Sequence, residues 1–127
     1  MQNKIGIPEA AHYFFGQIKN ADAIVLSVAE HNGNVTSAFK NLWDWTSRIE
    51  QKLWMNKPLF LASTSPGGRG AKSAFDIMQN LLPHYGGNVV ASLTLPLFND
   101  NLQGDTIIDS AKQSQLLGQL ELFTKAI

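Results

Sequence analysis

The sequence predicts an α/β fold in which a parallel sheet lies between layers of helices. Three apolar runs are too short for buried helices and are followed by turn residues, which indicates buried strands. The segments around these runs carry apolar residues at every third or fourth position, which is typical of helices. A chain that alternates helix and strand in this way forms a doubly wound sheet with right-handed crossovers.

The first predicted element is a short helix over residues 7–20. Pro8 suits the first turn of a helix, where its missing N–H group would have no partner in any case. The apolar residues of this segment form one stripe, namely Ala11, Phe14, Phe15 and Ile18. His12 lies beside the stripe, and we assign it no role.

The first strand is predicted from Ala23 to Val28. Its nearly continuous apolar run predicts a parallel strand that is buried on both faces. The polar segment from Glu30 to Asn34 follows directly. Gly33 and a neighbouring asparagine can adopt positive φ at little cost, so the chain can reverse here and present its backbone N–H groups outward.

A helix is predicted after this turn, with its apolar residues between Val35 and Leu53 in an unusually wide arc. Asp44 is spaced to form an ion pair with either Lys40 or Arg48, four residues away on each side. The extra width of the arc indicates a second packing partner beyond the sheet. This partner is either another subunit or another helix of the same chain, and the sequence leaves both alternatives open.

The stretch from residue 21 to residue 45 resembles the NAD(P)H-dependent FMN reductases, a family of flavodoxin-like proteins that includes quinone, chromate and azo-dye reductases. In that family a strand beginning with Ala-Asp ends in Pro-Glu-Tyr-Asn-Gly, and the next helix carries Leu-Lys-Asn and then Asp-Trp. The corresponding segments here are Ala21-Asp22, Ala29 to Gly33, Phe39 to Asn41, and Asp44-Trp45. Ala29 and His31 depart from the family's Pro and Tyr.

The second strand is predicted from Leu59 to Thr64, followed by a glycine-rich loop from Ser63 to Gly70 and then a helix. Ligands of open α/β sheets bind at the carboxyl ends of the strands, so this loop and the Glu30 to Asn34 turn should be neighbours. Glycines let a flat or anionic ligand approach the backbone, and the following helix N-terminus offers unpaired N–H groups. A plain glycine-rich turn is the alternative, although the family has a similar loop beside the isoalloxazine.

The third strand is predicted from Asn88 to Leu95, and a final helix follows a long loop. Asp105 or Thr106 is the expected cap of this helix. Its apolar stripe is predicted to contain Ile108, Ala111, Leu116, Leu117, Leu120, Phe123 and Ile127. The segment from Phe98 to Leu102 also resembles the family's C-terminal part.

In the flavodoxin-like strand order 2-1-3-4-5, the three strands correspond to the third, fourth and fifth. The resemblance therefore implies a three-layer α/β/α domain over residues 1–127 that lacks the family's first two strands and phosphate-binding loop, as after an N-terminal truncation. FMN binding should then be weakened. The first strand of the chain would form an exposed sheet edge, so we expect a homodimer or homotetramer.

Composition excludes several other classes of function. Ten basic and ten acidic residues cancel, so neither nucleic acid nor an anionic membrane is favoured as a partner. The absence of cysteine excludes disulfides and thiolate zinc sites, and three scattered histidines do not support another metal site. A serine hydrolase is disfavoured because no Gly-x-Ser-x-Gly elbow occurs. No run reaches the roughly 18 apolar residues of a membrane span, and we expect a soluble, cytoplasmic protein.

The resemblance implies an enzyme that passes a hydride from NADPH or NADH through FMN to a small-molecule acceptor such as free flavin, a quinone or a metal oxyanion. Because the cofactor carries this chemistry, no side chain is predicted to be catalytic. The residues implied to border the isoalloxazine are Glu30, His31, Asn32 and Gly33 on one side, with Ser65, Pro66, Gly67, Gly68 and Gly70 on the other.

Three questions stay open at the level of sequence. His31 either forms a hydrogen bond to the flavin or is an exposed loop residue. Arg69 is the one basic residue of the two loops, and it does not decide between NADPH and NADH. The alternative function is a non-catalytic flavodoxin-like remnant that binds a partner through its wide apolar helix face and open sheet edge. FMN binding distinguishes this remnant from a reductase.

Overall fold

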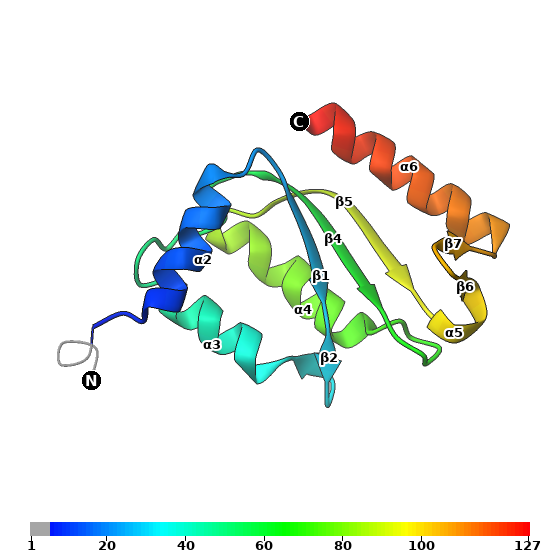
Figure 1. The fold of residues 1–127 in the computed structure, drawn as a ribbon, viewed down its shortest axis with the longest axis horizontal. Helices are drawn as coiled ribbons and strands as arrows, with labels where there is room; N and C mark the ends of the chain where they lie inside the picture. The colour runs from blue at the N-terminus through cyan, green and yellow to red at the C-terminus, as the bar shows by residue number, and fades with distance from the viewer. Residues whose placement is uncertain (1–5) are drawn as a thin grey trace.

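The computed structural model describes residues 6–127 and contains a parallel sheet with helices on both sides (Figure 1). The three strands of this sheet lie in the order β1-β4-β5, and their bounds are Ile24–Val28, Pro58–Thr64 and Asn88–Leu95. Both strand pairs are parallel. The predicted parallel α/β fold and its three strands are therefore confirmed.

Helices connect the strands as predicted. They are α2 (Glu9–Asn20), α3 (Ser37–Thr46), α4 (Lys72–Leu81) with the short 3-10 helix η1 (Leu82–Tyr85), and α6 (Ser110–Ala126). The loops contain smaller elements, which are β2 (Glu30–His31), β3 (Asn34–Val35), α5 (Phe98–Asn101), β6 (Leu102–Gln103) and β7 (Thr106–Ile107). None of the helices in residues 6–127 is long and apolar enough to cross a bilayer.

The two faces of the sheet are covered by different helices. Leu59 and Leu61 of β4 belong to the larger core cluster, which also includes residues of α2, α3 and α4. Phe60 points to the opposite face, where its ring meets that of Phe123 in α6 at 5.8 Å in an edge-to-face arrangement. Helices on both faces of a parallel sheet give the three layers that the sequence predicts.

The prediction that β1 is buried on both faces is wrong. Ile24, Leu26 and Val28 face the larger core, but Val25 on the other face is 66% exposed. Val25 is in register with Phe60, so both side chains lie on the face that α6 covers. Because α6 packs over β5 and β4, it leaves the part of this face that belongs to β1 open.

Helix α3 is shorter than its apolar pattern predicts. It ends at Thr46, whose hydroxyl donates to the Leu42 carbonyl oxygen at 2.7 Å, and a series of turns follows. Leu53 and Trp54 are buried in these turns, and the ring centroids of Trp54 and Trp43 are 5.4 Å apart. Apolar spacing therefore indicated burial correctly here but not helical conformation.

The second packing partner of α3 comes from the same chain. Helix α2 packs against α3, and a small hollow between them is lined by residues of both helices, including Ala11 and Trp45. This packing supports the alternative of another helix within the chain as the reason for the wide apolar arc.

The final helix differs from its prediction in its cap and its stripe. Asp109 caps α6 by accepting a hydrogen bond from the Lys112 N–H at 2.8 Å, whereas Thr106 belongs to the small strand β7. Neither Asp105 nor Thr106 is the cap, so that prediction is wrong. Within the predicted stripe Phe123 is buried, but several members are exposed, namely Ile108, Leu117, Leu120 and Ile127.

Candidate functional site

The segment after β1 is a tight β-hairpin. Strands β2 and β3 pair antiparallel, with His31 opposite Asn34, and the turn residues Asn32 and Gly33 have φ of 54° and 77°. Two consecutive positive φ values and the Asn-Gly sequence are typical of a type I′ turn. The expected positive φ at Gly33 and a neighbouring asparagine is confirmed.

The loop after β4 combines an exposed tip with a buried end. Residues 66–69 are exposed, whereas Gly70 is buried and has φ of +62°. A Cβ atom at Gly70 would lie 2.9 Å from the Pro96 nitrogen, so only glycine allows this close approach of two backbones. The Ser63 hydroxyl donates to the Gly70 carbonyl oxygen at 2.7 Å and fixes the end of the loop.

The segment after β5 forms a third part of this surface, which the sequence analysis did not include. The Leu97 N–H donates to the Gly67 carbonyl oxygen at 2.9 Å, and the Phe98 N–H donates to that of Ser65 at 3.0 Å. Leu97 has φ of +52° and is 42% exposed. The signal that could have indicated it is its place directly after a strand next to β4, since parallel strands end at a common edge.

The prediction that the first two loops are neighbours is confirmed by the strand register, because Val28 at the end of β1 pairs with Ser63 of β4, and a hydrogen bond also joins the first loop to α4. The Ala74 N–H near the start of α4 donates to Oε1 of Glu30 at 2.9 Å. The Lys72 N–H donates to the Arg69 carbonyl oxygen at 3.2 Å. Two of the amides expected to be available for an anionic ligand at this helix N-terminus are thus already bonded within the chain.

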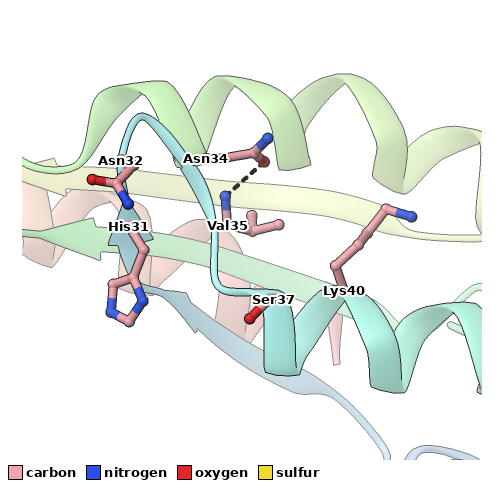
Figure 2. Close-up of a pocket in the computed structure, with 6 residues that line it drawn as sticks. All are labelled: His31, Asn32, Asn34, Val35, Ser37 and Lys40. Carbon is pink, nitrogen blue, oxygen red and sulfur yellow. Dashed lines mark hydrogen bonds between the residues drawn. The ribbon is translucent and has the colours of Figure 1, made fainter.

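An open hollow of about 420 Å³ lies on the α3 side of the hairpin (Figure 2). It is lined by His31, Asn32, Asn34, Val35, Ser37 and Lys40. In Figure 2 the side chains of His31 and Asn32 lie on the hairpin at one end, and Lys40 projects from α3 at the other. Lys40 is paired with Asp44 at 2.6 Å, as the sequence spacing predicts, so its charge is largely compensated.

The predicted site residues therefore fall into three groups. His31 and Asn32 line the hollow, and Gly33 completes the turn beside them. Glu30 directs its carboxylate to α4. The predicted residues of the second loop do not line this hollow, and they are Ser65, Pro66, Gly67, Gly68 and Gly70. Of these, Ser65 and Gly67 accept hydrogen bonds from the segment after β5.

Comparison with known proteins gives a consistent result. A family model described as NADPH-dependent FMN reductase matches residues 1–100. A quinone reductase of Escherichia coli K12 is 28% identical over 137 aligned positions, which cover 100% of this chain and 70% of that protein. An NAD(P)H-dependent FMN reductase of Pseudomonas aeruginosa is 32% identical over 79 positions, covering 61% of this chain and 43% of that protein.

A solved structure is also similar over nearly the whole chain. It is FerB, a flavoenzyme NAD(P)H:(acceptor) oxidoreductase from Paracoccus denitrificans, with a TM-score of 0.76 and 25% sequence identity. The match covers 98% of this chain and 70% of FerB. Together with the strand order β1-β4-β5, this similarity confirms the predicted flavodoxin-like α/β fold.

Proposed function

Because the chain belongs to the NADPH-dependent FMN reductase family, a family of oxidoreductases that use FMN and NAD(P)H, we propose that its two neighbouring loops border the flavin ring in hydride transfer. The observation that carries this proposal is that both loops leave the carboxyl edge of the sheet, where Val28 of β1 is in register with Ser63 of β4. In addition, Glu30 of the first loop accepts a hydrogen bond from Ala74 in the helix after the second loop. Ligands of open α/β sheets bind at such edges.

The tip of the second loop suits a flat ring. A Cβ atom at Gly68 would have no heavy atom within 4 Å, and one at Gly67 would meet only the Ser65 hydroxyl, at 3.8 Å. The backbone at these two glycines is therefore open to a planar ligand. On the hairpin, His31 and Asn32 can offer hydrogen bonds to the polar edge of the ring.

The same loops are less suited to the phosphate of FMN. The amides of Lys72 and Ala74 are already bonded, and the Glu30 carboxylate at the start of α4 would repel an anion. We propose that the phosphate is held by groups outside these two loops, while the loops hold the ring.

FMN, when bound, supplies the acceptance and donation of the hydride. The residues of this chain would orient the ring. His31 and Asn32 would form hydrogen bonds to its polar edge, and the peptide groups of Gly67 and Gly68 would hold its plane. No side chain is assigned as a catalytic acid or base.

The acceptor that we propose is a quinone. Its support is the activity of the relatives, which include quinone reductases and a 2-hydroxy-1,4-benzoquinone reductase from a Burkholderia species. We propose either NADPH or NADH as the hydride donor, since Arg69, the one basic residue of the two loops, is exposed.

We propose that residues 1–127 form one domain, that the protein acts in the cytoplasm, and that it assembles as a homodimer or homotetramer. The support for assembly is the position of β1 at the end of the sheet order and the exposure of Val25. The same surface supports the alternative function, an oligomerising module that does not bind FMN.

Titration with FMN tests the proposal and separates the two functions. Saturable quenching of FMN fluorescence with a Kd near 1 μM, equivalent to about −8 kcal/mol, is expected for a reductase. Oxidation of NADPH and NADH with 1,4-benzoquinone as acceptor then measures turnover. A folded chain, checked by circular dichroism, that does not bind FMN at up to about 1 mM would overturn the reductase proposal and support the module.

A further inference from the structure

We propose that Glu30 is a positioning residue that locks the flavin-facing hairpin to the start of α4. The identity of the ring as the ligand rests on the proposed function, but the lock itself does not. It stands on the hydrogen bond from the Ala74 N–H to Oε1 of Glu30, which joins residues 44 positions apart.

Helix α4 lacks a cap of its own. Its N-cap residue is Ala71, which has φ of +61° and no side chain able to accept a hydrogen bond, and its first turn contains no acidic residue. By contrast, Thr36 caps α3 and Asp109 caps α6 with their own side chains. Glu30 supplies α4 with both a hydrogen-bond acceptor and a negative charge at its positive end.

The hairpin is held at its base on both sides. Glu30 is paired with Val35 across the hairpin, and Val35 is 7% exposed and packs in the larger core cluster. The Glu30 side chain bonds to α4 from the same base. The turn residues 31–34 are exposed and project from this base, so their direction depends on the two anchors.

Loss of the Glu30 anchor should therefore release the turn without unfolding the core. Val35 would still hold one side of the base, and α4 would keep its apolar packing through Ala74, Phe75 and Met78. His31 and Asn32, the hairpin residues assigned to the edge of the ring, would lose their fixed orientation. Pre-organised contacts of this kind contribute to affinity by lowering the entropic cost of binding.

The test compares Glu30→Ala with Glu30→Gln and with Asp109→Ala. Gln keeps a carbonyl oxygen that can accept from Ala74, and Asp109→Ala removes a helix cap that lies outside the two loops. Amide hydrogen exchange is measured by NMR in the absence of FMN. In Glu30→Ala we expect the amides of Ala74 and of residues 31–34 to exchange about 10-fold faster or more, with most of this effect reversed in Glu30→Gln.

FMN affinity is the second readout. We expect Glu30→Ala to weaken FMN binding about 10-fold, whereas Asp109→Ala, with a comparable loss of stability, leaves the affinity unchanged. Equal amide exchange rates in the hairpins of Glu30→Ala and wild type would contradict the proposed role of Glu30. Exchange in Glu30→Gln as fast as in Glu30→Ala would contradict it as well. If wild type does not bind FMN, the proposed function fails, and the exchange data still decide whether Glu30 positions the hairpin.

Discussion

The glycines of the loop after β4 have different physical roles. Gly70 is buried, has φ of +62° and lies against the backbone of Pro96. Gly68 is exposed, and a Cβ atom there would meet no heavy atom within 4 Å. The first glycine is required by the fold, whereas the second leaves a surface open to a ligand.

This difference predicts that substitution by alanine lowers stability at Gly70 but FMN affinity at Gly68. Gly70→Ala should lower the free energy of unfolding by about 2 kcal/mol or more, because the left-handed conformation costs about 1 kcal/mol and the new Cβ atom overlaps the Pro96 backbone. Gly68→Ala should change it by less than about 0.5 kcal/mol but weaken FMN binding. Urea denaturation and FMN titration measure the two effects, and similar unfolding midpoints for the two variants would contradict this assignment.

His31 allows a second prediction at this scale. Its side chain is exposed and lines the hollow beside the hairpin, so His31→Ala should leave the free energy of unfolding within about 0.5 kcal/mol of wild type. If the imidazole bonds the ring, the same variant should bind FMN about 5-fold to 10-fold more weakly, as for a net hydrogen bond of about 1 kcal/mol. His84→Ala, at an exposed position in η1, is the control. Equal FMN affinities for the two variants would make His31 an ordinary loop residue.

The sequence could predict residue-scale features that depend on local chemistry. Asn32 and Gly33 adopt positive φ as their types favour, and Lys40 pairs with Asp44 one helical turn away. The contact of Gly70 with Pro96 and the bond from Ala74 to Glu30 join distant segments. Such contacts depend on how the strands align, which residue types alone do not specify.

At the scale of elements, the strands were predictable and the helix ends were not. The strand from Asn88 to Leu95 has the predicted bounds, because a short apolar run between turn residues has few alternatives. Helix α3 ends well before Leu53, because Leu53 and Trp54 are buried in turns that pack against the core. Side chains buried from compact turns can show the same apolar spacing as those of a helix, so the spacing alone does not locate the helix end.

The contribution of the Asp109 cap of α6 to stability can be tested by substitution. Asp109→Ala should lower the free energy of unfolding by about 1 kcal/mol, since it leaves the Lys112 N–H without its acceptor. Asp105→Ala, at an exposed position before β7, should change it by less than about 0.5 kcal/mol. Urea denaturation of the two variants measures the difference. The reverse order would restore the sequence-based assignment of the cap to Asp105.

The whole molecule has one sheet face that is only partly covered. The Ser92 N–H of β5 donates to Oε1 of Gln119 in α6 at 2.9 Å, and β4 pairs with the other side of β5. The Gln119 side of α6 therefore faces the outer edge of β5. Leu120 of α6 is 39% exposed, and Val25 of β1 is 66% exposed.

This uncovered face adjoins an open sheet edge. Among residues 6–127, β1 pairs with β4 alone, so its outer backbone groups have no strand partner. An unpaired edge beside exposed apolar side chains favours association with a second chain. The wide apolar face of α3, for which the sequence left another subunit or another helix open as partner, is in contrast partly covered by α2.

A matched pair of lysine substitutions tests whether the β1 surface is the interface between copies of the chain. Val25→Lys places a charge on the uncovered face and should convert the expected oligomer to monomer, because burying an unpaired charge is costly. Leu122→Lys is the control, since Leu122 is 52% exposed and lies one turn after Gln119, on the side of α6 that faces away from β1. Size-exclusion chromatography with light scattering at about 50 μM measures the mass of each variant. A monomeric wild type under these conditions would contradict the proposed assembly. An equal response of the two variants would place the assembly surface elsewhere.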